Sequence, residues 1–193
     1  LDYSSKLQQT QIGFEVLMGG AENATKHLKE LQDFAKSTPF SGLEFAKISQ
    51  GLQGAGVQAQ NVIPLLKAIG NTVAATGEVS AERLEGVSRA ITQIISKTKV
   101  SAEEMEQLAE RGIPAWKILS DALGKTQQET RKLAEQGLIS SDILIKALKQ
   151  VSEVKYGDAM EKQTGTFSGA MSKIQNAVLA ASATAFAPFY QEI

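Results

Sequence analysis

The sequence has no cysteine and a single histidine, two side chains on which many catalytic and metal sites depend. The absence of cysteine excludes disulfides, thiolate metal sites and a cysteine nucleophile. One histidine does not supply the several imidazole ligands that many zinc sites use. His27 lies among Lys26, Lys29 and Glu30 in a segment of helical character, so we expect it on a solvated helix face.

The sequence also has no large excess of positive or negative charge. The 20 basic and 21 acidic residues give a net charge of −1, which argues against a dedicated nucleic-acid binder, because such proteins carry a basic excess. Hydrophobic residues make up 42% of the chain and charged residues 21%. The 193 residues can therefore bury a core, as one good-sized domain or two small ones.

No segment shows a sustained alternation of apolar and polar residues, so we expect no significant β-sheet. Helix starts are marked instead, by Ser80 and by three pairs with the spacing of a capping box. These pairs are Ser41 with Glu44, Ser101 with Glu104, and Thr126 with Glu129. The predicted fold class is all-α: a multi-helix bundle of short helices joined by glycine and proline turns, with longer N-terminal helices and an apolar C-terminal helix.

Catalytic and nucleotide-binding motifs are missing as well. Gly51, Gly54 and Gly56 superficially resemble a phosphate loop, but they follow no strand and lack the established glycine patterns, so we interpret them as a helix end. No GxSxG or HExxH motif is present. We therefore predict no enzyme activity, no cofactor, no metal site and no catalytic residue.

Other conspicuous side chains have structural explanations. Glu103, Glu104 and Glu106 lie near an expected helix start, where the helix dipole favours acidic residues. Trp116, the only tryptophan, is expected to anchor the core.

Residues 129–148 are expected to form a helix, a turn and a second helix, an arrangement that also occurs in DNA-binding proteins. The second helix, from Ser141 to Gln150, offers only Lys146 and Lys149 as basic residues and is otherwise mostly aliphatic. We therefore interpret it as a core helix and predict no specific nucleic acid binding.

One short sequence device occurs twice in the second half of the chain. The sequence LAERGI at residues 108–113 returns as LAEQGL at residues 133–138, 25 residues later, and a fainter copy lies at residues 52–57. Glycine just past a helix end favours a left-handed backbone, and the aliphatic residue after it can cover the end of the helix. We expect Gly112 and Gly137 to stop helices in this way, so that consecutive helices pack on one another.

Residues 1–38 carry an apolar stripe with the seven-residue repeat of a coiled coil. The stripe has two rows, Leu7, Phe14, Ala21, Leu28 and Ala35 in the first and Leu17, Ala24 and Leu31 in the second. Gly19 and Gly20 interrupt it, so we expect two helices or one bent rod. We interpret the stripe as packed inside the protein, with self-association as the alternative.

These patterns predict three parts: residues 1–38 as an N-terminal helical arm, residues 39–166 as a compact helical domain, and residues 167–193 as the start of an apolar helix. Residues 149–166 are expected to form one helix with frayed ends and then a turn. The stretch from Ala177 to Tyr190 is mostly small or apolar, and we interpret it as a buried helix, with a membrane segment as the alternative. Because the sequence begins without methionine and stops inside this strong pattern, we expect a piece of a longer protein.

Four segments, in order along the chain, are similar to a known family. They are residues 34–40 (FAKSTPF), 62–70 (VIPLLKAIG), 108–137 and 160–172 (MEKQTGTFSGAMS). Together they resemble the N-terminal region of tape measure proteins of long-tailed bacteriophages and prophages, and the resemblance covers nearly the whole chain. The long coiled-coil repeats of that family are not found here, which fits a piece that stops before them.

The resemblance implies a non-enzymatic structural protein of the virion tail. Such proteins act as an extended ruler inside the tail tube and set its length during assembly, which takes place in the host cytoplasm. They contact tail tube, tail chaperone and tip or baseplate proteins. Some have apolar segments that enter the host membrane, and the segment from Ala177 onward would match the start of one.

The glycine-stopped helices indicate a globular module rather than an extended ruler. We therefore hypothesise that this piece is a folded head or anchor domain, and that length is measured by other parts of the protein. The alternative is a soluble helical adaptor or protein-interaction module unrelated to virions.

Overall fold

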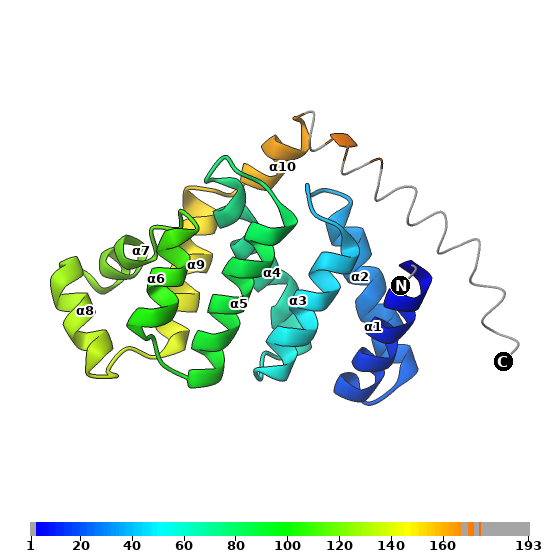
Figure 1. Ribbon diagram of the computed structural model, residues 1–193, viewed down its shortest axis with the longest axis horizontal. Coiled ribbons are helices and arrows are strands. Elements are labelled where there is room, and N and C mark those ends of the chain that lie inside the picture. The colour runs from blue at the N-terminus through cyan, green and yellow to red at the C-terminus, as the bar shows by residue number, and fades with distance from the viewer. Residues whose placement is uncertain (1–2, 167–169, 172–173, 175–193) are drawn as a thin grey trace, which may run out of the picture. The chain divides into compact units, whose positions relative to one another are not determined.

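The computed structural model describes residues 3–166 together with 170, 171 and 174, and this part contains ten α-helices and no strand (Figure 1). The all-α prediction is confirmed. The helices are α1 (Tyr3–Met18), α2 (Ala21–Ala35), α3 (Gly42–Gly54), α4 (Ala59–Ala74), α5 (Ala81–Lys97), α6 (Ala102–Glu110), α7 (Ala115–Leu123), α8 (Gln127–Glu135), α9 (Ser141–Val154) and α10 (Ala159–Thr164). The predicted apolar helix from Ala177 onward lies outside the described residues.

The chain divides into two compact units, one made of residues 1–50 and 161–193 and the other of residues 51–160. In the second unit α9 has a central place, because α4, α5 and α7 all pack against it (Figure 1). Helix α6 packs against α5, α7 and α8. The three-part division predicted from the sequence, with boundaries after residues 38 and 166, stays a prediction.

In the first unit, α1 and α2 pack on each other through the predicted stripe. Its buried members are Phe14, Ala24, Leu28, Leu31 and Ala35. Ala21 and Leu17 are exposed, so the stripe is covered for most of its length but not at its centre. Helix α1 ends at Met18 and α2 begins at Ala21, which confirms the predicted break at the two glycines.

Three phenylalanines, one from the end of α2 and two after it, form another part of the core of the first unit. The ring centroid of Phe45 lies 4.9 Å from that of Phe34 and 5.8 Å from that of Phe40. Phe40 and Phe45 are at most 2% exposed. Aromatic pairs at these separations stabilise a core beyond the effect of their buried area alone.

Most of the predicted helix starts are confirmed. The capping boxes of Ser41 with Glu44 and of Thr126 with Glu129 are both formed, each with its two reciprocal hydrogen bonds. Ser80 accepts a hydrogen bond from the backbone N–H of Arg83 at 3.1 Å, as an N-cap should. The box predicted at Ser101 is wrong, because that side chain accepts no hydrogen bond from the helix backbone.

The repeated device forms the same helix end in all three copies. Gly112 and Gly137 have φ of +75° and +69°, in the left-handed region that was predicted. The amide of the last residue donates to the carbonyl of the first at 3.0 Å in residues 108–113, 2.9 Å in residues 133–138 and 3.0 Å in residues 52–57. This bond is the outer one of a Schellman motif, so one local pattern ends three helices in the same way.

The aliphatic residue after each glycine has a different environment in the first two copies. Ile113 is 1% exposed and covers its helix end as predicted, whereas Leu138 is 66% exposed. In the second copy the next residue, Ile139, is buried instead, at 1%. The repeat thus sets the backbone turn, while the neighbouring helices decide which side chain is covered.

The connection between α5 and α6 departs from the predicted glycine and proline turns. Thr98 takes the left-handed conformation there, with φ of 58°, which a β-branched residue such as threonine rarely adopts. Lys99 pairs with Ser140 in an isolated antiparallel bridge. The backbone N–H of Val100 donates to the carbonyl of Ile139 at 2.9 Å. Pairing with a distant loop therefore holds a backbone conformation that the local sequence does not favour.

The single helix predicted over residues 149–166 is wrong, because α9 ends at Val154 and α10 begins at Ala159. Asn71 on α4 makes two hydrogen bonds at the turn between them. Its Nδ2 donates to the carbonyl of Gly157 at 3.4 Å, and its Oδ1 accepts from the backbone N–H of Met160 at 3.2 Å. A side chain 86 residues earlier than Gly157 in the sequence therefore stabilises the turn.

Candidate protein-interaction site

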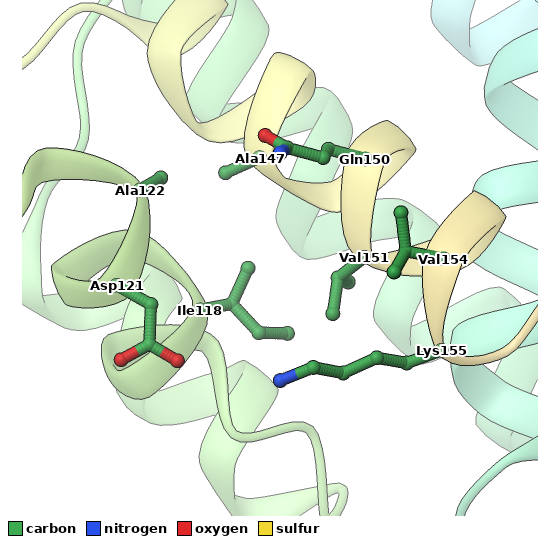
Figure 2. A pocket seen from close by; sticks show the side chains of 8 residues that line it. All are labelled: Ile118, Asp121, Ala122, Ala147, Gln150, Val151, Val154 and Lys155. Carbon is green, nitrogen blue, oxygen red and sulfur yellow. The ribbon is translucent and has the colours of Figure 1, made fainter.

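An apolar groove lies between α7 and α9 and encloses about 170 Å³ (Figure 2). Ile118 of α7 faces Ala147 and Val151 of α9, and Val154 stands at the end of α9. Val154 is 76% exposed. Grooves with this lining are suited to an aliphatic side chain of a partner helix or peptide.

Charged side chains stand at the edge of the same groove. Asp121 on α7 forms an ion pair with Lys117, one helical turn before it, at 3.0 Å. Lys155 extends across the groove from the end of α9 toward α7 (Figure 2). An apolar floor with charges at the edge is the usual anatomy of a protein-interaction surface.

The lining of the groove is mostly apolar. Its polar lining residues are Asp121, Gln150 and Lys155.

Nowhere in residues 3–166 do three or more histidine, aspartate or glutamate side chains come together as a metal site. Among the helices that the structure describes, none is both long and apolar enough to cross a membrane.

Trp116 is a core anchor, as predicted, and is 4% exposed. Its Nε1 donates to the carboxylate of Glu106 at 3.1 Å. Arg131 donates to the same carboxylate at 2.7 Å, and its guanidinium carbon lies 4.4 Å from the centre of the indole ring. The hydrogen bond from Arg131 is the main reason why the pKa of Glu106 lies below its ordinary value. These three residues connect α6, α7 and α8.

Glu104 does more than interact with the helix dipole, which was its predicted role. The side chain is buried, its carboxylate accepts from the Nζ of Lys97 at 2.5 Å, and it also accepts from the hydroxyl of Ser101. Burial alone would raise the pKa of Glu104, but the hydrogen bonds from Lys97 and Ser101 hold it below its ordinary value. The sequence showed the helix start but not the lysine that approaches from α5.

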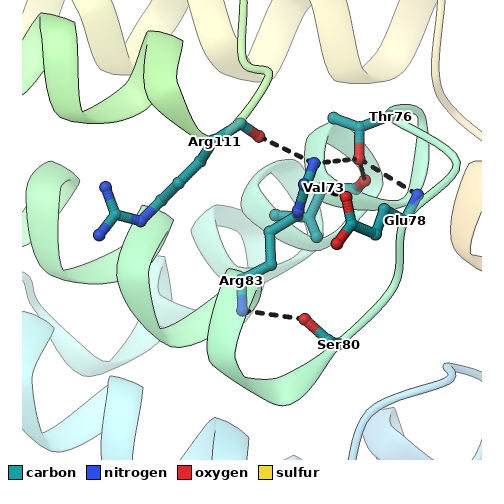
Figure 3. A network of polar contacts seen from close by, with 6 residues as sticks. All are labelled: Val73, Thr76, Glu78, Ser80, Arg83 and Arg111. Atoms are coloured by element: carbon teal, nitrogen blue, oxygen red, sulfur yellow. Dashed lines mark hydrogen bonds and ion pairs between the residues drawn. The ribbon is translucent and has the colours of Figure 1, made fainter.

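Arg83 connects three helix ends in the second unit (Figure 3). Its Nη1 donates to the hydroxyl of Thr76 at 3.1 Å and to the carbonyl of Arg111 at 3.0 Å. Its Nη2 pairs with the carboxylate of Glu78. The planar guanidinium can make all of these contacts at once, so Arg83 fixes the ends of α4 and α6 to the start of α5.

The prediction of a solvated His27 is wrong, because the side chain is 3% exposed. Its Nε2 lies 2.8 Å from the hydroxyl of Ser49, and its ring packs edge-on against Phe14 with a centroid distance of 5.1 Å. Burial lowers the pKa of His27, and the carboxylate of Glu30 opposes this shift. Its charged sequence neighbours concealed that His27 lies on the buried side of α2.

The two segments that resembled nucleotide-binding and DNA-binding elements form a helix end and a core helix, as predicted. Residues 51–56 form the end of α3, where Gly56 has φ of +100°. In α9, Leu144, Ala147 and Leu148 are buried, so it is a core helix.

The family model and both relatives that the chain matches are tape measure proteins. A family model described as "Tape measure protein" matches residues 1–185. The chain is 32% identical over 154 residues to a probable tape measure protein of Salmonella phage Felix O1 (isolate Felix O1-VT1), an alignment that covers 77% of this chain and 19% of that protein. It is 25% identical over 157 residues to a tape measure protein of Lactococcus phage F4-1, which covers 78% of this chain and 42% of that protein. The chain thus spans less than half of each relative's length. No solved structure matches it.

Proposed function

Because the chain belongs to the tape measure protein family, we propose that it is a folded, non-enzymatic module of such a protein and that it acts in tail assembly by binding other tail proteins. The proposal places it in the virion tail, inside the tail tube, and in the host cytoplasm during assembly. Its partners would be tail tube, tail chaperone and tip or baseplate proteins. The observation that carries the proposal is the apolar groove between α7 and α9, beside the exposed Val154.

The geometry of residues 51–160 supports a binding role over a measuring role. A continuous helix adds about 1.5 Å of length per residue and so makes a good ruler. Helices α4 to α9 instead pack back on one another. An added residue therefore does not increase the end-to-end distance of this folded unit by a fixed amount. We therefore propose that length is measured by other parts of the parent protein.

The experiment that tests this proposal leaves the length of the chain unchanged. Ile113→Asp, introduced into the parent protein in its phage, places a charge at a site that is 1% exposed. It should destabilise the module by more than about 4 kcal/mol. If the module binds assembly partners, infectious tails should be lost.

The matched control is Leu138→Asp, the same position in the second copy of the repeated device, which is 66% exposed. It should leave the fold and the tails intact. Tails of normal length and number from the Ile113→Asp phage would refute a folded binding module. Likewise, an in-frame deletion within residues 43–148 should abolish tail assembly, and shorter infectious tails would show that these residues act as a ruler.

A second candidate function, self-association through α1, is favoured by three exposed aliphatic side chains. Ile12, Val16 and Leu17 are 54%, 80% and 45% exposed. Light scattering on residues 1–193 measures the molar mass directly. An oligomer that Val16→Glu converts to a monomer would support this candidate, and a monomeric wild-type protein would exclude it.

A further inference from the structure

We propose that a second groove, between α4 and α9, binds an acidic side chain next to an aliphatic one, both presented by another tail protein. The inference rests on the proposed function, since it assumes that this module binds another protein. The groove encloses about 440 Å³, within the roughly 300–1,000 Å³ of typical binding pockets. It is separate from the α7–α9 groove, although α9 contributes to both.

Two lysines on facing helices make this groove basic. Lys67 comes from α4 and Lys149 from α9. In the part of the chain that the structure describes, neither lysine forms an ion pair with a carboxylate. Glu153 is the acidic residue in the lining, so the groove has a formal charge of +1 in a chain whose net charge is −1. This local excess favours an incoming carboxylate.

The polar part of the lining offers neutral hydrogen-bond donors. Asn71 and Ser152 line the groove and are 1% and 3% exposed. The Nδ2 of Asn71 donates to the hydroxyl of Ser152 at 3.3 Å and to the carbonyl of Gly157 at 3.4 Å. Both distances exceed the usual 2.7–3.2 Å of such bonds, so the Nδ2 of Asn71 makes two long hydrogen bonds here. A carboxylate that enters the groove can accept shorter, charge-assisted bonds from Asn71 and Ser152.

Helix α4 also contributes apolar surface to the groove. Ile63, Pro64 and Ala68, all on α4, provide aliphatic surface beside Lys67. A polyanion such as nucleic acid would gain nothing from this surface and would be repelled by Glu153. A peptide with an aliphatic residue next to an acidic one can use both the apolar surface and the lysines. Charge of this kind contributes more to specificity than to affinity.

The test uses two blocked peptides of defined sequence, titrated into the ¹⁵N-labelled chain of residues 1–193 and followed by NMR. The first is acetyl-Glu-Leu-Ala-Glu-Leu-Ala-amide, and the second has lysine in place of glutamate. We expect the acidic peptide to shift the amide signals of α4 and α9 around the groove, the side-chain amide of Asn71 included. The basic peptide should leave these signals unchanged.

Charge-reversal variants show whether the two lysines are responsible. Lys67→Glu with Lys149→Glu should raise the Kd of the acidic peptide about tenfold or more, since two attractions become repulsions. The matched control, Lys47→Glu with Lys125→Glu, makes the same charge change at two exposed lysines outside the groove and should leave the Kd unchanged. Circular dichroism of both double variants verifies that they remain folded.

The following outcomes would overturn the inference: no shifts at millimolar peptide, equal binding of the basic peptide, shifts confined to other helices, or equal loss of binding in the control variant. Groove signals that change with protein concentration alone would assign the groove to a second copy of this chain and would also overturn it. Loss of tails in the Ile113→Asp phage does not depend on these peptides. The proposed function and this inference can therefore fail separately.

Discussion

At the scale of single residues, His27 is a neutral side chain in a place where a charge is costly. It packs between Phe14 and Ser49, and burial lowers its pKa below the ordinary value of 6.5. The unfolded chain takes up a proton near that value, whereas the folded protein does so only at lower pH. The free energy of unfolding therefore falls as the pH drops below 6.5 and levels off once the pH is below the lowered pKa.

We expect the midpoint of thermal unfolding to decrease between pH 7 and pH 5, because the pKa of His27 is lower in the folded protein than in the unfolded chain. No other histidine in the sequence can contribute to this decrease. Circular dichroism at constant ionic strength measures this midpoint. The His27→Gln variant removes the titrating group and should flatten the profile over the same interval. An equal decrease in this variant would show that other groups cause the pH dependence.

At the scale of helices and their ends, the same substitution should have opposite effects at two glycines. Gly112→Ala forces an alanine into the left-handed region at a cost of about 1–2 kcal/mol, and its Cβ would lie 3.3 Å from the Nη1 of Arg83. Gly51→Ala lies inside α3, where its Cβ would lie 3.9 Å from Thr92, and should stabilise the fold by about 0.5–1 kcal/mol. Urea denaturation measures both changes.

Gly137→Ala separates the two contributions at Gly112. It has the same left-handed backbone, but its Cβ would lie no closer than 3.6 Å to the side chain of Lys99. It should therefore destabilise less than Gly112→Ala. A greater loss at Gly137 would contradict the role assigned to Arg83 at the end of α6.

The contacts of Arg83 predict that lysine cannot replace it, although the charge is conserved. Lysine lacks the planar fork that reaches both Thr76 and the carbonyl of Arg111. We expect Arg83→Lys to lower the free energy of unfolding by about 1–3 kcal/mol. Arg89→Lys, an exposed position on the same helix, is the control and should have almost no effect. Equal stability of the two variants in urea would refute the role of Arg83.

At the scale of the whole molecule, the two compact units make a prediction about fragments. Residues 51–160 form one unit, so they should unfold cooperatively when produced alone. A fragment of residues 39–166 should be less stable, because it keeps Phe40 and Phe45 but lacks Phe34, which packs against Phe45. Exposure of these rings should increase the binding of a hydrophobic dye.

Thermal unfolding and dye fluorescence of the two fragments decide between the divisions of the chain. If residues 39–166 melt as sharply as residues 51–160 and bind no more dye, the compact domain predicted from the sequence is the better description. Circular dichroism before heating checks that both fragments are helical.

The sequence by itself determined the all-α fold class and how several of the helices begin and end. Capping boxes, the left-handed glycines and the spacing of apolar residues act between residues close together in the chain, so they can be read without a structure. The Schellman turns at residues 108–113 and 133–138 are the clearest case. The tape measure family was also recognisable from four segments in order.

Only the tertiary structure decided which of these side chains are buried and where the grooves lie. Ile113 is covered and Leu138 is not, although their local sequences are nearly the same. Lys97 reaches Glu104 from another helix, and Asn71 on α4 bonds to the turn after α9. Such contacts join residues far apart in the sequence, and no local pattern encodes them. The α7–α9 and α4–α9 grooves arise in the same way, from packing between distant helices.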